Sequence, residues 1–190
     1  MKKENILFIV VALIIGLLVG IIAGNKGGSS SSGSSSNPPA AAAPVQNYDQ
    51  KIKMLKEVVA KEQDNRTAWV QLGNNYFDSN QFLQAVEAYD KALELDDNDP
   101  NVLTDQGVMF RKLGWFDRAV QNFEKAAKIS PNHSQSLYNL GIVYRYDLND
   151  FPSAIKAWER FLRVAPPGPS TSQVQAEVDF MKSQPQGTGY

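Results

Sequence analysis

The sequence of 190 residues contains no cysteine and a single histidine, His133. Without cysteine the chain forms no disulfide, offers no thiolate to zinc, and has no cysteine to act as a nucleophile or to carry a lipid or haem. Neither sign of charge is in excess, because 19 Lys and Arg face 20 Asp and Glu. Nucleic-acid surfaces need clustered basic residues, so we expect no nucleic-acid partner. Length and composition suit one globular domain with additional segments.

One long apolar run stands near the beginning of the chain. Residues 6–24 read ILFIVVALIIGLLVGIIAG, which is 19 residues without a charge. As a helix of about 28 Å, this run matches the hydrocarbon thickness of a bilayer. A cleaved signal peptide has a shorter apolar core and ends in a small-x-small site, which Ile21-Ile22-Ala23 does not provide. We therefore expect residues 1–24 to be a retained transmembrane anchor.

The charges that flank the run predict its orientation. Lys2 and Lys3 precede it, and Lys26 alone follows closely. The positive-inside rule then leaves the N-terminus in the cytoplasm and the rest of the chain outside it, in the periplasm if the source is bacterial. Small residues also recur every fourth position, which is a candidate seam for a homodimer, although glycine is common in membrane helices generally. These residues are Ala12, Gly16, Gly20 and Gly24.

Residues 25–47 differ from the segments on either side. They consist mostly of Gly, Ser, Pro and Ala and carry one charge, Lys26. Such a segment cannot bury enough apolar surface to offset the entropy cost of ordering. We expect a disordered linker between the anchor and the rest of the chain.

After the linker, one pattern repeats every 34 residues. Its glycines are Gly73, Gly107 and Gly141. Apolar residues fall at helical spacing on both sides of a short break, so each unit is predicted to be two amphipathic helices joined by a turn. The third unit has one residue more than the others, and we expect it in the turn at 147–151. The first unit reads Trp69-x2-Leu72-Gly73-x2-Tyr76, then Ala85-x3-Tyr89-x2-Ala92.

This pattern resembles the tetratricopeptide repeat family, whose signature is W-x2-L-G-x2-Y followed by A-x3-F on a 34-residue period. The resemblance implies an all-α fold, an α-solenoid of three helix-turn-helix repeats at about 66–99, 100–133 and 134–168. One repeat cannot bury its own apolar face, so the ends need covering helices. We expect these at 48–61 and at 172–182, the second opened by a capping box of Ser172 and Gln175. The domain would then span 48–182, and 183–190 would be a flexible tail.

In this family the first helix of each repeat lines a concave groove that receives a peptide or a partner's helix. Residues of these helices outside the apolar pattern are therefore candidate partner-binding residues, although each also suits an ordinary solvated helix face. The amide side chains can both donate to and accept from a peptide backbone. Arg111 and Arg145, one repeat apart, suit a carboxylate. The ten candidates are Gln71, Asn74, Thr104, Asp105, Val108, Arg111, Tyr138, Asn139, Ile142 and Arg145.

One branch of the family binds the acidic C-terminal tails of chaperones through a clamp of Lys, Arg and Asn side chains. The matching positions here are Val70, Asn74, Asp105, Gln135 and Asn139. One Asn is kept and every cation is missing, so we reject a chaperone clamp.

The sequence contains no set of residues that would support catalysis. No nucleophile, acid and base fall on neighbouring motifs. His133 follows Pro131 in a predicted turn, and the acidic residues 96–99 lack the glycine and the distal Glu of a calcium loop. We predict no enzymatic activity, no metal and no cofactor.

These features favour a single-pass membrane protein that presents a protein-binding scaffold outside the cytoplasm, in the assembly of an envelope complex. Two alternatives stay open. One is a structural protein that self-associates through the small-residue seam and its stacked ends. The other is an assembly factor, because the layout of anchor, linker and repeats is similar to that of the anchored tetratricopeptide proteins of bacterial cytochrome c maturation.

Overall fold

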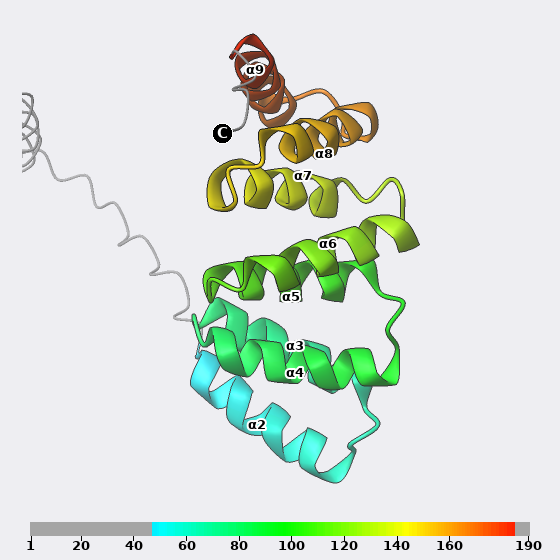
Figure 1. The fold of residues 1–190 in the computed structure, drawn as a ribbon. Coiled ribbons are helices and arrows are strands. Elements are labelled where there is room, and N and C mark those ends of the chain that lie inside the picture. The colour runs from blue at the N-terminus through cyan, green and yellow to red at the C-terminus, as the bar shows by residue number, and fades with distance from the viewer. Residues whose placement is uncertain (1–46, 185–190) are drawn as a thin grey trace, which may run out of the picture. The chain divides into compact units, whose positions relative to one another are not determined.

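The computed structural model describes residues 47–184, which form a stack of eight α-helices without a strand (Figure 1). The predicted all-α solenoid of helix pairs is confirmed. Consecutive helices pack against one another from α2 at one end to α9 at the other. The helices are α2 (Tyr48–Lys61), α3 (Arg66–Asp78), α4 (Phe82–Leu95), α5 (Pro100–Lys112), α6 (Phe116–Ile129), α7 (Ser134–Ile142), α8 (Phe151–Val164) and α9 (Pro169–Ser183), with a π-helical turn, η1 (Val143–Asp147), after α7.

The expected anchor at residues 1–24, the linker before residue 47 and the end of the tail lie outside the described residues. Within 47–184, none of the helices is long and apolar enough to cross a bilayer.

The first helix of each repeat begins at the same kind of cap. Asn65, Asp99 and His133 stand 34 residues apart, and the side chain of each accepts a hydrogen bond from the backbone of the first turn that follows. Such caps satisfy N–H groups that have no partner inside the helix. His133 is therefore a half-buried helix cap. Asn47 caps α2 in the same way, and α2 has the bounds 48–61 predicted from the sequence.

An aromatic ring lies against a glycine in every helix pair. A Cβ atom placed on Gly107 would lie 2.6 Å from Cε1 of Phe123, closer than real atoms approach. The aromatic residues concerned are at most 1% exposed. Only glycine lets the two helices come this close, which explains why a residue of poor helix propensity recurs in mid-helix. The pairs are Gly73 with Tyr89, Gly107 with Phe123 and Gly141 with Trp158.

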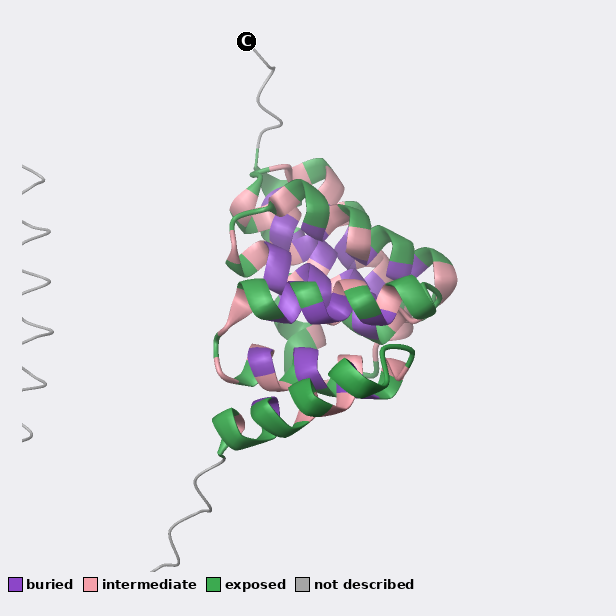
Figure 2. Cartoon of the chain, turned by 90° about the horizontal axis from the view of Figure 1, so that it is seen from below, coloured by how far each residue is buried: buried purple, intermediate pink, exposed green. Residues whose placement is uncertain are grey.

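The buried residues form an interior that runs along the stack (Figure 2). One apolar cluster extends from α2 into α8, and a second joins α6, α7, α8 and α9. Tyr144 packs against both clusters. Each helix pair thus shares its core with its neighbours, as expected for a repeat that cannot bury its own apolar face.

The extra residue of the third repeat lies in a helix, and its predicted place in the turn is wrong. Asn80, Gly114 and Asn149 have φ of 60°, 77° and 54° and occupy the same place in the three turns. Asn149 is therefore an ordinary turn residue. The helix before it widens into η1, where the N–H of Leu148 donates to the carbonyl of Val143 at 2.9 Å. A π-helical turn takes up one additional residue without breaking the helix.

The last helix begins at Pro169, three residues before its predicted start. Proline suits this place because a first-turn residue needs no N–H partner. The N–H of Gly168 donates to Oγ1 of Thr171 at 2.8 Å. Ser172 and Gln175 do not form the expected capping box, because both lie inside α9. The hydroxyl of Ser172 donates to the carbonyl of Gly168 instead.

We predict that Gly107→Ala destabilises the domain. Overpacking of a core costs about 1–3 kcal/mol, and the better helix propensity of alanine returns about 1 kcal/mol. Because the 2.6 Å contact places the overpacking cost at the upper end of this range, the net loss should be about 2 kcal/mol in the free energy of unfolding, measured by urea titration with circular dichroism. Adding Phe123→Leu, which shortens the opposing ring, should recover part of the loss. A Gly107→Ala variant as stable as the parent would contradict this packing.

Candidate functional site

The ten predicted partner-binding residues lie on the first helices of the three repeats. Gln71 and Asn74 belong to α3, and both are exposed. The other eight come from α5, α7 and η1, and α5 packs directly against α7. We call the surface that these residues form the first-helix face. Most of its members on α5, α7 and η1 are half-buried, so they offer part of each side chain to a partner.

Thr104 does not belong to that surface. Its side chain is fully buried, and its hydroxyl donates to the carbonyl of Pro100 at 2.7 Å. A threonine can satisfy its hydroxyl one turn back within its own helix, so a polar residue can stand in the core without a tertiary partner. The apolar pattern of the sequence was therefore wrong in placing Thr104 among the surface residues. Gln106 and Ser136 are likewise polar and buried.

The two arginines of the first-helix face already hold carboxylates of this chain. Arg111 forms an ion pair with Asp147 through two hydrogen bonds. Arg145 pairs with Glu177 at 3.2 Å, and its guanidinium lies 4.8 Å from the ring centre of Phe151. Each pair links one repeat to the helix that follows it. A carboxylate of a partner would have to displace these contacts, so the arginines do not offer the free site expected from the sequence.

An acidic group remains on the first-helix face. Within the described part of the chain, Asp105 forms no ion pair. Burial, followed by the nearby charges of Asp99 and Asp78, raises the pKa of Asp105 to about 6. Next to it, the hydroxyl of Tyr89 donates to Oδ1 of Asn74 at 2.8 Å. This part of the face therefore favours a cationic or neutral group over an anionic one.

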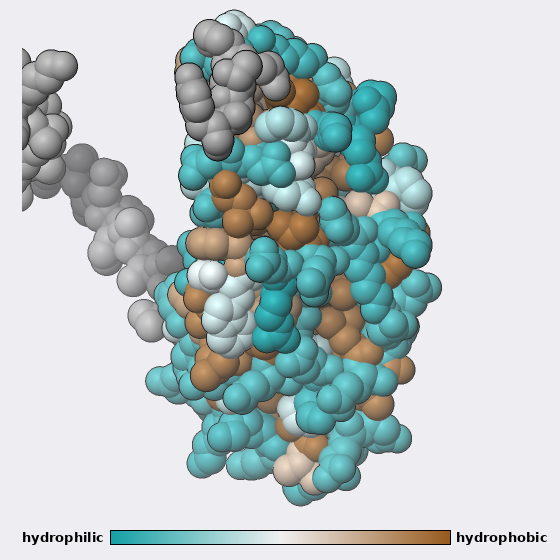
Figure 3. Space-filling model, viewed as in Figure 1, coloured by the Kyte–Doolittle hydropathy of each residue, from teal (hydrophilic) through white to brown (hydrophobic). Residues whose placement is uncertain are grey.

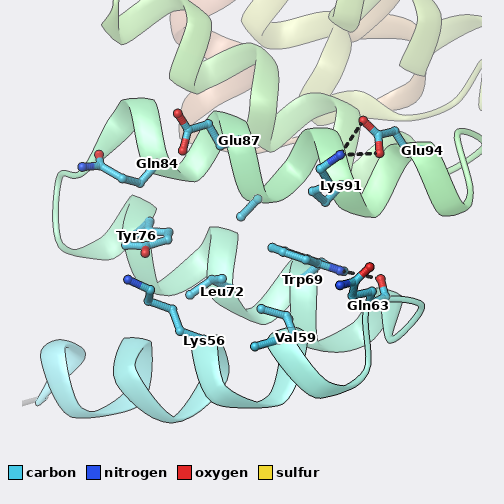
Figure 4. A pocket seen from close by; sticks show the side chains of 12 residues that line it. Lys56, Val59, Gln63, Trp69, Leu72, Tyr76, Gln84, Glu87, Lys91 and Glu94 are labelled. Carbon is cyan, nitrogen blue, oxygen red and sulfur yellow. Dashed lines mark hydrogen bonds and ion pairs between the residues drawn. The ribbon is translucent and has the colours of Figure 1, made fainter.

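A recess of about 750 Å³ lies between α2 and α4, with α3 as its floor (Figure 4). Trp69, Leu72 and Tyr76 of α3 point into it, and Val59 of α2 closes one side. Its rim is charged on both sides, with Lys56 opposite Glu87. None of the ten predicted residues lines this recess, which we call the α2–α4 recess. It was missed because the resemblance points to the first helices, whereas the recess opens between second helices.

The equivalent place in the second repeat is partly filled by a polar side chain. Gln106 stands 34 residues after Leu72, and its amide donates to Asp90 at 2.7 Å and accepts from Asn122 at 2.7 Å. A polar recess of about 640 Å³ remains beside it, lined by Asp97, Gln121 and Lys125 among others. In the third repeat, which has Leu140 at the matching place, the recess is smaller, about 280 Å³. The first repeat therefore differs from the second in the apolar floor of its recess and from the third in its size.

Acidic and histidine side chains do not gather into a metal site within residues 47–184. The acidic turn that follows α4 is engaged in ion pairs. Asp97 pairs with Lys125 at 2.7 Å, and Asp99 pairs with Arg66 at 2.7 Å. These pairs neutralise the turn and join neighbouring repeats.

We predict that Asp105→Asn stabilises the domain in a pH-dependent way. The folded pKa of about 6 lies above the unfolded value of about 3.9. The protonated carboxyl is therefore preferred in the folded state, and its contribution is full below about pH 4 and lost as pH rises through 6. At pH 8 the variant should be more stable by on the order of 1–2 kcal/mol, and at pH 4 nearly equal, by urea titration. Asp64→Asn, an exposed turn residue, is the control, and an equal gain at both pH values would refute the assignment.

The known proteins that are similar to this chain match it in the region of the repeats. A TPR repeat model matches residues 73–114, and two tetratricopeptide repeat models match residues 100–133 and 135–167. Among solved structures, MamA superposes with a TM-score of 0.64 at 20% identity, covering 71% of this chain and 81% of that one. The TPR domain of Arabidopsis OM64 gives 0.57 at 18% identity, covering 60% and 94%. These similarities show the fold.

Curated relatives match through the same region. The small glutamine-rich tetratricopeptide repeat-containing protein 2 of Mycosarcoma maydis is 27% identical over 50% of this chain and 26% of its own length. The protein O-mannosyl-transferase TMTC1 of Homo sapiens is 25% identical over 68% of this chain and 15% of its own. The probable SPINDLY N-acetylglucosaminyltransferase of Hordeum vulgare is 32% identical over 58% and 12%. The chain thus spans at most 26% of the length of each relative, and the activities in those names belong to those proteins.

Proposed function

Because this chain is a tetratricopeptide repeat protein, a class that generally serves as a non-catalytic scaffold, we propose that it binds a partner protein through its first-helix face. The observation that carries the proposal is Asp105, a half-buried carboxylate without an ion-pair partner among the described residues, next to the exposed amide of Asn74. A buried acidic group of this kind is unfavourable in the free protein. A bound cation or hydrogen-bond donor would relieve it.

The chemistry of the face selects the kind of partner. Gln71, Asn74 and Asn139 offer amides that can pair with an extended backbone, and the half-buried Val108 and Ile142 offer apolar surface. The arginines are neutralised by Asp147 and Glu177. The partner segment is therefore neutral or basic, with apolar residues between its polar ones. This preference is opposite to that of the chaperone-clamp branch.

The α2–α4 recess is the second binding surface that the structure offers. Its aromatic floor of Trp69 and Tyr76 suits an apolar side chain, and aromatic residues dominate the energetics of protein interfaces. A partner that inserts a side chain there would be held between the second helices α2 and α4, against the aromatic floor on α3. The two surfaces can be told apart by where a partner is captured.

The proposal extends to the cellular setting. The uncharged run at residues 6–24 supports a membrane anchor, and the basic residues before it support an extracytoplasmic scaffold that serves the assembly of an envelope complex. Self-association through the seam of Ala12, Gly16, Gly20 and Gly24 and a role of the cytochrome c maturation type remain alternatives. All of these rest on segments outside the described residues or on layout.

Photocrosslinking in cells tests the proposed face. A photoreactive amino acid is placed at Asn139 on the first-helix face, at Gln84 in the α2–α4 recess, and at the exposed Arg163 of α8 as a control. We expect a specific partner from Asn139, identified by mass spectrometry. With that partner purified, Asp105→Lys should weaken binding at least tenfold, because it replaces the acidic group by a cation.

Three results would count against the proposal. Capture from Gln84 alone would transfer binding to the α2–α4 recess. Equal capture from all three positions would mean that the face is not selective. Unchanged affinity of Asp105→Lys for the captured partner would remove Asp105 from the site.

A further inference from the structure

The described domain begins and ends with half a repeat. The second helices begin at residues 48, 82, 116 and 151, and the first helices begin at 66, 100, 134 and 169. The steps are 34, 34 and 35 residues in both series, the last being lengthened by η1. By this register, and within residues 47–184, α2 is a second helix with no first helix before it, and α9 is a first helix with no second helix after it. Each end of the described domain therefore carries the half of a repeat that the other end lacks.

The α2 end exposes a face that the other second helices bury. Met54 corresponds in register to Ala88, Asn122 and Ala157. Ala88 and Ala157 are 2% and 3% exposed, and the half-buried Asn122 donates a hydrogen bond to Gln106 of the first helix of its own repeat. Met54 itself is 52% exposed. The next residue, Leu55, corresponds to Tyr89, the aromatic residue that lies against a glycine in the first repeat. Half-buried Leu55 thus stands where a second helix meets its first helix.

The α9 end exposes the complementary face. Ala176 corresponds in register to Gly73, Gly107 and Gly141, the small residues that receive the aromatic rings, and it is exposed. Phe180, one turn further along, is 52% exposed. Met54 and Phe180 are the most exposed large apolar residues of the described chain, on a surface that is mainly hydrophilic in the view of Figure 3.

The two ends match in size and in charge. Inside the domain a glycine meets an aromatic ring, and at the ends the smaller Leu55 would meet the larger Ala176, so the combined volume is partly compensated. Helix α2 carries four lysines against two acidic residues. In the last two turns of α9, Glu177 pairs with Arg145 and Lys182 pairs with Glu159. Asp179, which has no ion-pair partner within residues 47–184, therefore leaves this end with one negative charge. Opposite net charges favour contact between unlike ends and disfavour contact between like ends.

We propose that α9 of one copy packs against α2 of a second copy, so that the two helices complete a tetratricopeptide repeat between the molecules. The partner is a second copy of this chain. The interface is heterologous, since each copy contributes a different surface, and it can continue from copy to copy into short filaments. The proposal uses neither the first-helix face nor the α2–α4 recess. Its test is therefore independent of the test of the proposed partner binding.

Crosslinking between single-cysteine variants tests the proposal, because the chain has no cysteine of its own. Full-length Met54→Cys and full-length Ala176→Cys are mixed in detergent micelles and treated with a short bismaleimide. Both residues are exposed, so neither change should alter the fold, which melting by circular dichroism checks. We expect a mixed dimer at least ten times more abundant than with Arg163→Cys, on the exposed side of α8, in place of Ala176→Cys.

Each other outcome overturns the proposal. A dominant Met54→Cys product with itself would show a two-fold dimer through α2. Equal yields with Ala176→Cys and Arg163→Cys would show contact without a preferred surface. As an independent readout, Ala176→Arg should remove the largest species that the parent forms in sedimentation velocity while its melting midpoint stays unchanged. Persistence of those species in Ala176→Arg would also overturn the head-to-tail contact.

Discussion

The contact between a mid-helix glycine and a buried aromatic ring is the constraint on which the rest of this structure depends. It fixes how closely the two helices of a repeat approach, at Gly73, Gly107 and Gly141 alike. That distance decides how the next pair can stack, and the stack in turn decides which side chains of the first helices reach the surface. Burial of rings as large as those of Phe123 and Trp158 contributes most of the apolar area within each pair.

Ion pairs add a second layer of connection between neighbouring repeats. Arg66 reaches Asp99, Arg111 reaches Asp147, and Arg145 reaches Glu177. Pairs of this kind contribute modestly to stability when they are partly exposed. Their larger consequence is functional, because they remove the cations from the first-helix face and leave Asp105 to set its character. The partner binding that we propose for this face would therefore favour segments of a different charge from those that the chaperone-clamp branch binds.

Much of the fold follows from the sequence, because the 34-residue period carries its own physical content. Glycine, aromatic and cap recur together, so the number of repeats, the helix pairs and the helical covers at both ends could be predicted. The differences between the predicted and the observed fold come from local hydrogen bonds and backbone conformation. Thr104 is buried because its hydroxyl bonds within its own helix, and the extra residue of the third repeat widens η1 because the turn at Asn149 keeps its shape. Neither effect can be recognised from the hydropathy pattern of the sequence.

The candidate site was less predictable than the fold. Its position on the first helices came from the family resemblance, but its charge depended on pairs formed across repeats, such as that of Arg111 with Asp147, which the sequence alone does not reveal. The apolar floor of the α2–α4 recess includes Leu72 at the place where the second repeat has the hydrogen-bonded Gln106. The matching half-repeats at the two ends became visible only when both helix starts and exposures were known.

The central claim, that the same glycine-on-ring contact builds all three repeats, is tested most directly by nuclear magnetic resonance of the folded domain. The resonance of a proton held against an aromatic ring is displaced by the ring current. The account predicts Hα signals for Gly73, Gly107 and Gly141 that are displaced well away from the ordinary glycine position, in contrast to Gly114, which has no atom within 4 Å of where its Cβ would be. Signals of the three glycines at the position of Gly114 would contradict the packing from which the rest of the structure follows.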